Sequence, residues 1–301
     1  MFDPESMRIG LLGAGRLAAS LGAALIEAGY RIEGVASRQE ASARRLASSL
    51  TTSVAAMTPQ ELAERSDLVF VTVPDAAVAA VVSSIDWRSG QAVVHCSGAL
   101  GLASLDAAAA RGAAVGCFHP LQSFPALEGD ASRFRDITCG IEASGDLSVV
   151  LESITVRSGA SIIRLEGVDR AAYHAAAVFA SNYVVSLMAA ARRAWTEAGL
   201  PAESARPSLA PLLSGAAENI SRHELSEALT GPVARGDVET VRHHLVALGD
   251  SDLAALYRAL GAELLTLRLP HDAATAAALE AALAPPQLQL EDRTGRHPLA
   301  G

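Results

Sequence analysis

The stretch that decides the fold is GLLGAGRLAASLG, from Gly10 to Gly22, near the start of the 301-residue chain. It overlaps the end of the apolar run Met7–Leu12 and has the pattern of a turn that opens a helix. Gly13 allows a tight turn, Gly15 lets the backbone approach a pyrophosphate, and Ala18 permits close packing of helix on strand. The free N–H groups at such a helix start suit phosphate oxygens. A plain glycine turn is the alternative; the strand–turn–helix context favours a dinucleotide site formed by Gly13, Ala14, Gly15, Arg16, Leu17 and Ala18.

The first half of the chain alternates short apolar runs with helical patterns, which is typical of a doubly wound α/β fold with a parallel sheet. One helix start is explicit, because Thr58-Pro59-Gln60-Glu61 combines an N-cap, a first-turn proline and a capping box. Strands are expected at Met7–Leu12, Arg31–Ala36, Asp67–Val73, Gln91–Cys96 and Ala113–Phe118, with further ones at Ile137–Ala143 and Ser161–Leu165.

After about Gly167 the strand patterns give way to alanine- and leucine-rich helical segments, punctuated by prolines such as Pro207 and Pro211. We therefore expect a Rossmann-like domain over 1–166, an all-α domain over 167–284, and a loose tail over 285–301. The apolar stretch Tyr173–Ala191 approaches the length of a membrane span, but polar side chains interrupt it. It is predicted to be a buried helix of a bundle.

Composition narrows the class of protein. Charged residues make up 19% of the chain and the formal net charge is -9, which disfavours nucleic acid and anionic membranes as partners. All 24 basic side chains are arginines, so no lysine can form a Schiff base or donate a proton. The three cysteines form no CxxC pair, and the N-terminus has no signal-peptide pattern. We expect a cytoplasmic protein.

The end of the second predicted strand indicates which dinucleotide is bound. An NAD site usually has a carboxylate there that binds the ribose 2′-hydroxyl. This chain has Ser37 and Arg38 instead, with Glu33 too early in the strand and Glu40 already in the next helix. A hydroxyl and a guanidinium suit a 2′-phosphate, so the sequence predicts NADP(H). The alternative is that Arg38 only begins a solvated helix.

Other chemistry-bearing residues follow the predicted strands, at the edge where α/β sheets bind ligands. Val73, Pro74 and Asp75 should face the cofactor, although a strand stop with Asp75 as a helix cap explains them equally. Ser97 and His119 end two successive strands, so they should lie close together. Histidine suits proton transfer near neutral pH, which makes His119 the candidate donor; a buried structural histidine is the alternative.

Two further clusters have weaker patterns. His95, Cys96, Cys117 and His119 match no standard zinc spacing, so no metal is expected. In the helical half, His174, Ser181 and Asn182 share one helix face. They could line a substrate pocket, with His174 and Asn182 orienting the substrate, or form an internal hydrogen-bond network. Arg235 in LTGPVARGD could bind an anionic substrate or a partner, or simply lie in a helix–helix turn.

Several motifs together resemble a bacterial group of oxidoreductases that join a Rossmann-like NADP-binding domain to a C-terminal domain of unknown function. They are the glycine stretch, HCSGAL, FHPLQSF, RAAYHAAAVFASNYVV and LTGPVARGD. The resemblance implies the fold of the 6-phosphogluconate dehydrogenase superfamily, whose helical domains often build dimers. His119-Pro120 is similar to the His-Pro of prephenate dehydrogenases, where the histidine touches the substrate hydroxyl, and Ser97 matches a second polar contact. Arg170 stands where the group often has lysine, which argues against a mechanism of the ketopantoate reductase type.

The expected function is hydride transfer between NADPH and a small, anionic carbonyl or imine substrate, with a ketopantoate-like compound as first choice. His119 would donate the proton, helped by Ser97. The chain is expected to form a homodimer through its helical domain. The alternative is an NADP-binding sensor without turnover, which needs no polar groups converging on the reacting carbon.

Overall fold

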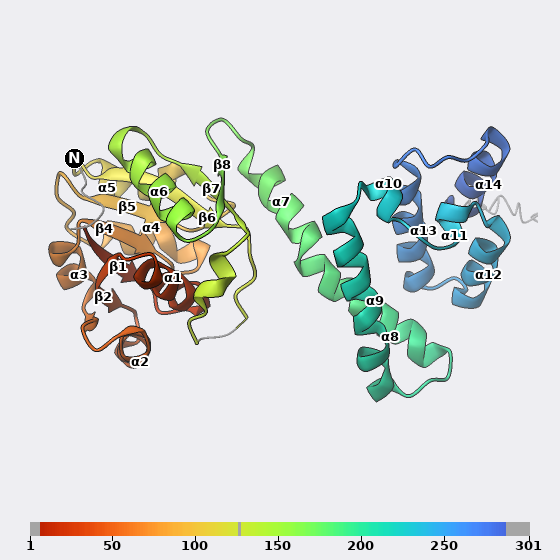
Figure 1. Ribbon diagram of the computed structural model, residues 1–301, viewed down its shortest axis with the longest axis horizontal. Helices are drawn as coiled ribbons and strands as arrows, with labels where there is room; N and C mark the ends of the chain where they lie inside the picture. Colours follow the sequence, from red (N-terminus) through yellow and green to blue (C-terminus); the bar gives the residue numbers. More distant parts are fainter. Residues whose placement is uncertain (1–6, 126–127, 287–301) are drawn as a thin grey trace, which may run out of the picture. The chain divides into compact units, whose positions relative to one another are not determined.

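The structure is a computed structural model that describes residues 7–125 and 128–286. The chain divides into two compact units, Met1–Asn182 and Tyr183–Gly301, and each is described by itself. The first unit contains an eight-stranded sheet in the order β3-β2-β1-β4-β5-β6-β7-β8 (Figure 1). Its strands are β1 (Arg8–Leu12), β2 (Arg31–Ala36), β3 (Ala55–Met57), β4 (Leu68–Val71), β5 (Ala92–His95), β6 (Ala114–Pro120), β7 (Thr138–Glu142) and β8 (Ser161–Arg164).

Helices cover both faces of this sheet, which explains the apolar strands (Figure 1). Phe70 and Val94 belong to a core shared with three helices, while Val69 and Val93 face the opposite core, as alternation along a strand requires. The first core includes α1 (Arg16–Glu27), α2 (Glu40–Leu50) and α6 (Gly145–Arg157); the second includes α3 (Pro59–Arg65), α4 (Asp75–Ser83), η1 (Leu102–Leu105) and α5 (Asp106–Ala109). The predicted α/β class and Rossmann-like arrangement are confirmed.

The predicted strands are largely present, and Thr58 forms its capping box with Glu61. Three points differ. The short strand β3 was not predicted. Strand β4 ends at Val71 and not at Val73, because the Thr72 hydroxyl hydrogen-bonds to the carbonyl oxygens of Leu12 and Gly13. Strand β6 continues through His119 and Pro120 because β7 pairs with it, and that pairing is antiparallel, whereas a parallel sheet was expected.

The antiparallel pairing places the start of β7 beside the end of β6. In register, His119 lies opposite Gly140 and Pro120 opposite Cys139. Helix α6 then returns the chain to β8, which runs parallel to β7. After β8, helix α7 (Arg170–Ala180) begins at Asp169, whose carboxylate accepts hydrogen bonds from Ala171 and Ala172 N–H. The end of β6, the start of β7 and the start of α7 together form one side of the candidate site.

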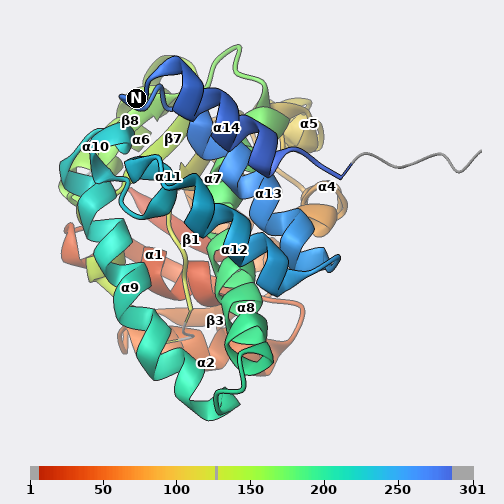
Figure 2. The ribbon, with the colours of Figure 1, turned by 90° about the vertical axis from the view of Figure 1, so that its right-hand side faces the viewer.

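The second unit is helical, as predicted for the C-terminal half. Helices α12 (Val238–Leu248), α13 (Asp252–Leu265) and α14 (Ala273–Leu283) pack around a small core that includes Val241, Leu245 and Leu279 (Figure 2). Before them come α8 (Asn182–Glu197), α9 (Ala202–Arg222), α10 (Leu225–Ala228) and α11 (Pro232–Arg235). Pro207 and Pro211 lie inside α9, so the expectation that they interrupt the helices is wrong. The expected tail lies outside the described residues from position 287 onward.

The expected burial of Tyr173–Ala191 is not observed, since neither α7 nor α8 contains a buried residue. In α8, residues at helical spacing such as Val184, Met188, Ala191 and Trp195 are half-buried, so the helix packs on one side only. Among the described residues, Arg170–Glu197 is the one helical stretch whose length and mean hydropathy of 1.3 would suffice to cross a membrane, which is weak evidence by itself.

Candidate active site

The turn between β1 and α1 is built around Gly13. Its φ is 126°, and its N–H donates to the carbonyl of Ala36 on β2 at 2.8 Å. A Cβ at this position would lie 2.7 and 2.8 Å from the backbone C and O of Thr72. The left-handed backbone and the close approach both require glycine. The turn thereby brings the carboxyl ends of β1 and β2 against the segment that follows β4.

Gly15 borders an open cleft. A Cβ on Gly15 would meet nothing within 4 Å, and Gly15 is the N-cap of α1 without any side-chain cap. The first N–H groups of α1 are therefore available to phosphate oxygens. The cleft holds about 560 Å³, a volume in the usual range for small-molecule sites. Its lining includes Gly13, Ala14, Gly15, Ser37, Arg38, Gln39, Ser42, Thr72, Val73 and Pro74.

Four of the expected cofactor residues lie outside the lining: Arg16, Leu17, Ala18 and Asp75. Arg16 is exposed, Leu17 packs against the core, and Ala18 is fully buried. Ala18 fits the role in helix packing that its small side chain suggested. The backbone turn of Gly13 to Gly15, and not the three residues that follow it, forms the wall of the cleft.

The end of β2 presents a hydroxyl and a guanidinium to the cleft. Ser37 and Arg38 both line it, and Arg38 is exposed with no ion pair to any described residue. The carboxylate of Glu33 is 7% exposed and bound by Arg31 and Arg65, so it cannot reach the cleft. This distribution of charge fits a ligand that carries a phosphate next to a ribose.

Asp75 and Ser97 join the cleft to a second pocket. Asp75 is the first residue of α4 after Pro74, and its Oδ2 accepts a 2.7 Å hydrogen bond from Ser97 Oγ. The alternative interpretation, in which Asp75 caps α4, is wrong, because Pro74 occupies the N-cap and α4 has no side-chain cap. Ser97 Oγ also accepts from the N–H groups of Ala99 and Leu100. Ser97 therefore fixes the loop after β5.

His119 lies where that loop meets β6. A Cβ on Gly98 would be 2.8 Å from Nε2 of His119 and 2.9 Å from Nδ1 of His174, so both rings press against this glycine. Nδ1 of His119 is 2.9 Å from the hydroxyl of Tyr173. The expected neighbours Ser97 and His119 are thus brought together by way of Gly98, although the Ser97 hydroxyl itself is bound to Asp75.

The electrostatic surroundings keep His119 neutral. Burial, followed by the influence of His174 and Arg170, lowers the pKa of His119 to about 4. Arg170 is 10% exposed and pairs with Glu142 on β7 at 2.6 Å. Burial likewise raises the pKa of the nearby Cys117 thiol to about 11. At neutral pH the histidine therefore has one ring N–H, and the thiol stays protonated.

The second pocket lies beside His119 and holds about 650 Å³. His174 and Asn182, both predicted as site residues, line it together with Ser181. His174 Nδ1 is buried without a hydrogen-bond partner among the described residues, while Asn182 Oδ1 accepts from Ser181 Oγ at 2.9 Å. The rest of the lining comes from the last residue of β6, the loop that follows it and α7: Pro120, Leu121, Gln122, Ser123, Phe124, Tyr173, Ala176, Ala177, Val178 and Ala180.

Tyr173 of this pocket, and two glycines packed against its side chains, were not singled out from the sequence. Tyr173 was seen only as a neighbour of His174, Gly98 only as part of the motif HCSGAL, and Gly140 belongs to no motif. Their importance depends on contacts between segments that are distant in the sequence. The rings of His119 and His174 occupy the space that a Cβ on Gly98 would need, and the Tyr173 hydroxyl occupies the space that a Cβ on Gly140 would need. The Tyr-His pair in RAAYHAAAVF and the motif HCSGAL were the signals available in the sequence.

Two other candidate features from the sequence were a metal cluster and Arg235. In residues 7–125 and 128–286 no group of three or more His, Cys, Asp or Glu could hold a metal ion. Arg235 is exposed at the end of α11 in the second unit, and Gly236 with φ of 70° ends that helix. Its expected contact with an anion stays a prediction.

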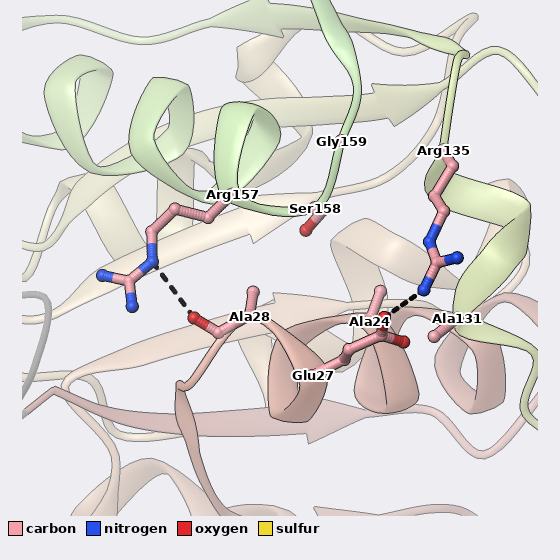
Figure 3. A pocket seen from close by; sticks show the side chains of 8 residues that line it. All are labelled: Ala24, Glu27, Ala28, Ala131, Arg135, Arg157, Ser158 and Gly159. Atoms are coloured by element: carbon pink, nitrogen blue, oxygen red, sulfur yellow. Dashed lines mark hydrogen bonds and ion pairs between the residues drawn. The ribbon is translucent and has the colours of Figure 1, made fainter.

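A smaller pocket of about 150 Å³ lies at the C-terminal ends of α1 and α6 (Figure 3). Its two arginines are already engaged: Arg135 pairs with Glu27, and Arg157 donates to the carbonyl of Ala28 at 3.0 Å. Figure 3 shows both side chains turned to these partners. Arginines at helix C-termini stabilise the last carbonyls, so this pocket has a structural explanation.

Comparison with known proteins agrees with the two-part architecture. A Rossmann-like domain profile matches residues 2–120, and the profile of a domain of unknown function, DUF2520, matches residues 137–264. A candidate NADP oxidoreductase from Bacteroides fragilis has 28% identity, with 87% of this chain and 99% of that chain covered and a TM-score of 0.70. A Thermotoga maritima protein has 28% identity, coverage of 90% and 98%, and a TM-score of 0.65.

A more distant structure is similar in fold alone. Pyrroline-5-carboxylate reductase from Streptococcus pyogenes has 16% identity, coverage of 92% of this chain and 96% of that chain, and a TM-score of 0.57. No curated protein matches the chain. The predicted resemblance to proteins that join a Rossmann-like domain to a C-terminal domain of unknown function is confirmed.

Proposed function

Because this chain joins a Rossmann-like domain to a DUF2520 domain, we propose that it is an NADP(H)-dependent oxidoreductase that reduces a small carbonyl or imine compound. The cofactor named for the Bacteroides fragilis protein is NADP, in agreement with the prediction made here from Ser37 and Arg38. The cleft at Gly13–Gly15 would hold the pyrophosphate on the N-terminus of α1, and Arg38 would bind the 2′-phosphate.

The observation that carries the proposal is the continuous contact between the cleft and the His119 pocket. Pro74 lines the cleft, its neighbour Asp75 binds Ser97, and Gly98 packs against His119 and His174. One short loop thus connects the proposed cofactor site to a pocket that contains a neutral imidazole. A binding protein needs no such convergence of polar groups beside its cofactor.

Bound NADPH would supply a hydride to the carbon of the C=O or C=N bond. The oxygen or nitrogen then takes one proton, and we assign its donation to Nε2 of His119. Ser97 would hold Gly98 in place through Asp75, and His174 and Asn182, which line the pocket, would orient the substrate. His174 belongs to α7, and Asn182 is the first residue of α8.

The pocket lining bears on whether the carbonyl or imine substrate is anionic or neutral. The ketopantoate-like first choice has no support from the comparisons, and the described lining of the pocket contains no arginine to bind a carboxylate. An anionic substrate would therefore need a cation from elsewhere in the protein. A substrate panel should include neutral ketones and imines beside 2-oxo acids.

We also propose that the chain acts as a homodimer through its helical unit. Large apolar side chains of that unit are exposed in the single chain, including Val185 at 72%, Leu212 at 70% and Ile220 at 56%. Exposed apolar groups on this scale usually mark an interface. Light scattering coupled to size-exclusion chromatography tests this, and a monomer at all concentrations would refute it.

A cytoplasmic location is expected, to be checked by cell fractionation.

The test of the function is NADPH oxidation with the panel of neutral and anionic carbonyl and imine compounds. Turnover in the wild type that His119→Ala abolishes, with NADPH binding retained, would support the proposal. NADPH binding without turnover on any compound would favour the sensor.

A further inference from the structure

His119 and Tyr173 form a defined pair in the candidate pocket. The Tyr173 hydroxyl lies 2.9 Å from Nδ1 of His119, and the two rings meet edge to face with centroids 5.5 Å apart. Both residues line the pocket and both are half-buried. The hydroxyl therefore has access to the pocket as well as to the imidazole.

The fold fixes the Tyr173 hydroxyl from two sides. Helix α7 is held to β7 by the ion pair between Arg170 and Glu142, and its first turn is capped by Asp169. Gly140, which is opposite His119 in the β6–β7 register, makes room for the hydroxyl. A Cβ on Gly140 would be 2.6 Å from Tyr173 Oη, well inside a normal contact.

Hydrogen bonding determines which ring nitrogen carries the proton. A neutral imidazole has one N–H donor and one acceptor, whereas a phenol has an O–H that must be donated when it is buried. No other acceptor for the Tyr173 hydroxyl occurs among the described residues. Donation from Oη to Nδ1 satisfies both groups and leaves the ring proton on Nε2. Nε2 is the nitrogen next to Gly98, on the side of the loop that joins the cofactor cleft.

We propose that Tyr173 is a positioning residue that holds His119 in the Nε2–H form, turns this N–H toward the reacting atoms, and replaces the proton that it gives up. The inference rests on the proposed function. As the Nε2 proton moves to the substrate oxygen or nitrogen, the Oη proton moves to Nδ1, so the imidazole stays neutral throughout. The phenolate that remains takes a proton from solvent water, and the hydroxide formed leaves to the bulk solvent, so the single proton consumed in the reduction comes from solvent. Burial raises the pKa of Tyr173 to about 12, and the positive charge of Arg170 opposes that rise.

The chain offers a matched control for this pair. In the second unit, Nδ1 of His244 lies 2.9 Å from the hydroxyl of Tyr257, with ring centroids 5.8 Å apart. Tyr257→Phe removes the same kind of hydrogen bond outside the candidate site. Tyr173→Phe should lower kcat by roughly 10²-fold, the scale of a positioned proton transfer, with KM little changed. Tyr257→Phe should leave kcat unchanged.

NMR of the ring nitrogens separates positioning from a structural role and does not depend on turnover. The proposal predicts Nε2–H for His119 in the wild type and a mixture of both tautomers in Tyr173→Phe. Gly140→Ala, which keeps the phenol but displaces its hydroxyl, should give the same mixture if Tyr173→Phe fails to fold. An Nδ1–H tautomer in the wild type, or a tautomer unaffected by these variants, would overturn the proposal. If no compound is turned over, the proposed reductase function is refuted. The tautomer of His119 measured by NMR still shows whether Tyr173 positions the ring proton.

Discussion

Gly98→Ala is predicted to disable the candidate site while leaving the fold intact. The new methyl group would lie 2.6 Å from Cε1 and 2.8 Å from Nε2 of His119, and 2.9 Å from Nδ1 of His174. Non-bonded carbon atoms prefer about 3.5 to 4 Å, so the His119 ring must move by about 1 Å. A displacement of that size at reacting groups lowers kcat/KM by about 10²-fold.

The assay compares kcat/KM, NADPH affinity and Tm of Gly98→Ala with those of Gly101→Ala. Gly101 lies three residues away in the same loop, and a Cβ there would meet nothing within 4 Å. We expect Gly101→Ala to behave like the wild type. Overpacking at Gly98 should destabilise the protein by about 1 to 3 kcal/mol, because the two imidazoles must repack. Full activity in Gly98→Ala would refute the geometry on which the site depends.

Three further results are expected. Burial lowers the pKa of both His95 and His119 from 6.5 to about 4, so the folded chain binds fewer protons between these values. The free energy of unfolding should therefore be unaffected by these histidines above pH 6.5 and should fall as the pH falls from 6.5 toward 4. The expected loss is up to about 3 kcal/mol for each histidine, and urea unfolding at several pH values would measure it. Arg170→Met leaves Glu142 without its partner and should destabilise the fold by about 3 kcal/mol in the same unfolding assay, whereas an unchanged midpoint would contradict the role of the ion pair. Arg38→Ala should weaken NADPH binding by at least about tenfold and NADH binding little, as the loss of one charge-assisted contact implies, and calorimetric titration would decide.

The parts of the fold that local sequence determines were predicted well. Strand β2 and the capping box at Thr58 were predicted correctly because a run of apolar residues and a spacing of three residues specify them directly. Strand β7 was predicted but its antiparallel direction was not, because the direction of a strand depends on the path of the preceding loop and not on its own residues. Pro207 and Pro211 were wrongly predicted to interrupt the helices. Helix α9 continues through both prolines, although each removes one backbone donor.

The site was predictable to the extent that topology brings strand ends together. The Gly13 turn follows β1 and His119 lies at the end of β6 in a doubly wound sheet, so their position at the ligand-binding edge could be expected. Tyr173 could not be paired with His119 from the sequence, because 54 positions separate them and their contact requires the antiparallel β6–β7 register and the start of α7. The hydrogen bond of Asp75 was equally hidden, since a carboxylate at a helix start suggests a cap.

The most direct test of the central claim is a comparison of the wild type with His119→Ala over the panel of carbonyl and imine compounds. It measures NADPH oxidation by absorbance and NADPH binding by calorimetry. We predict turnover of at least one compound by the wild type, and a loss of roughly 10² to 10⁴-fold in kcat with unchanged NADPH affinity in the variant. Turnover that survives in His119→Ala, or a wild type that binds NADPH and reduces none of the compounds, would contradict the account.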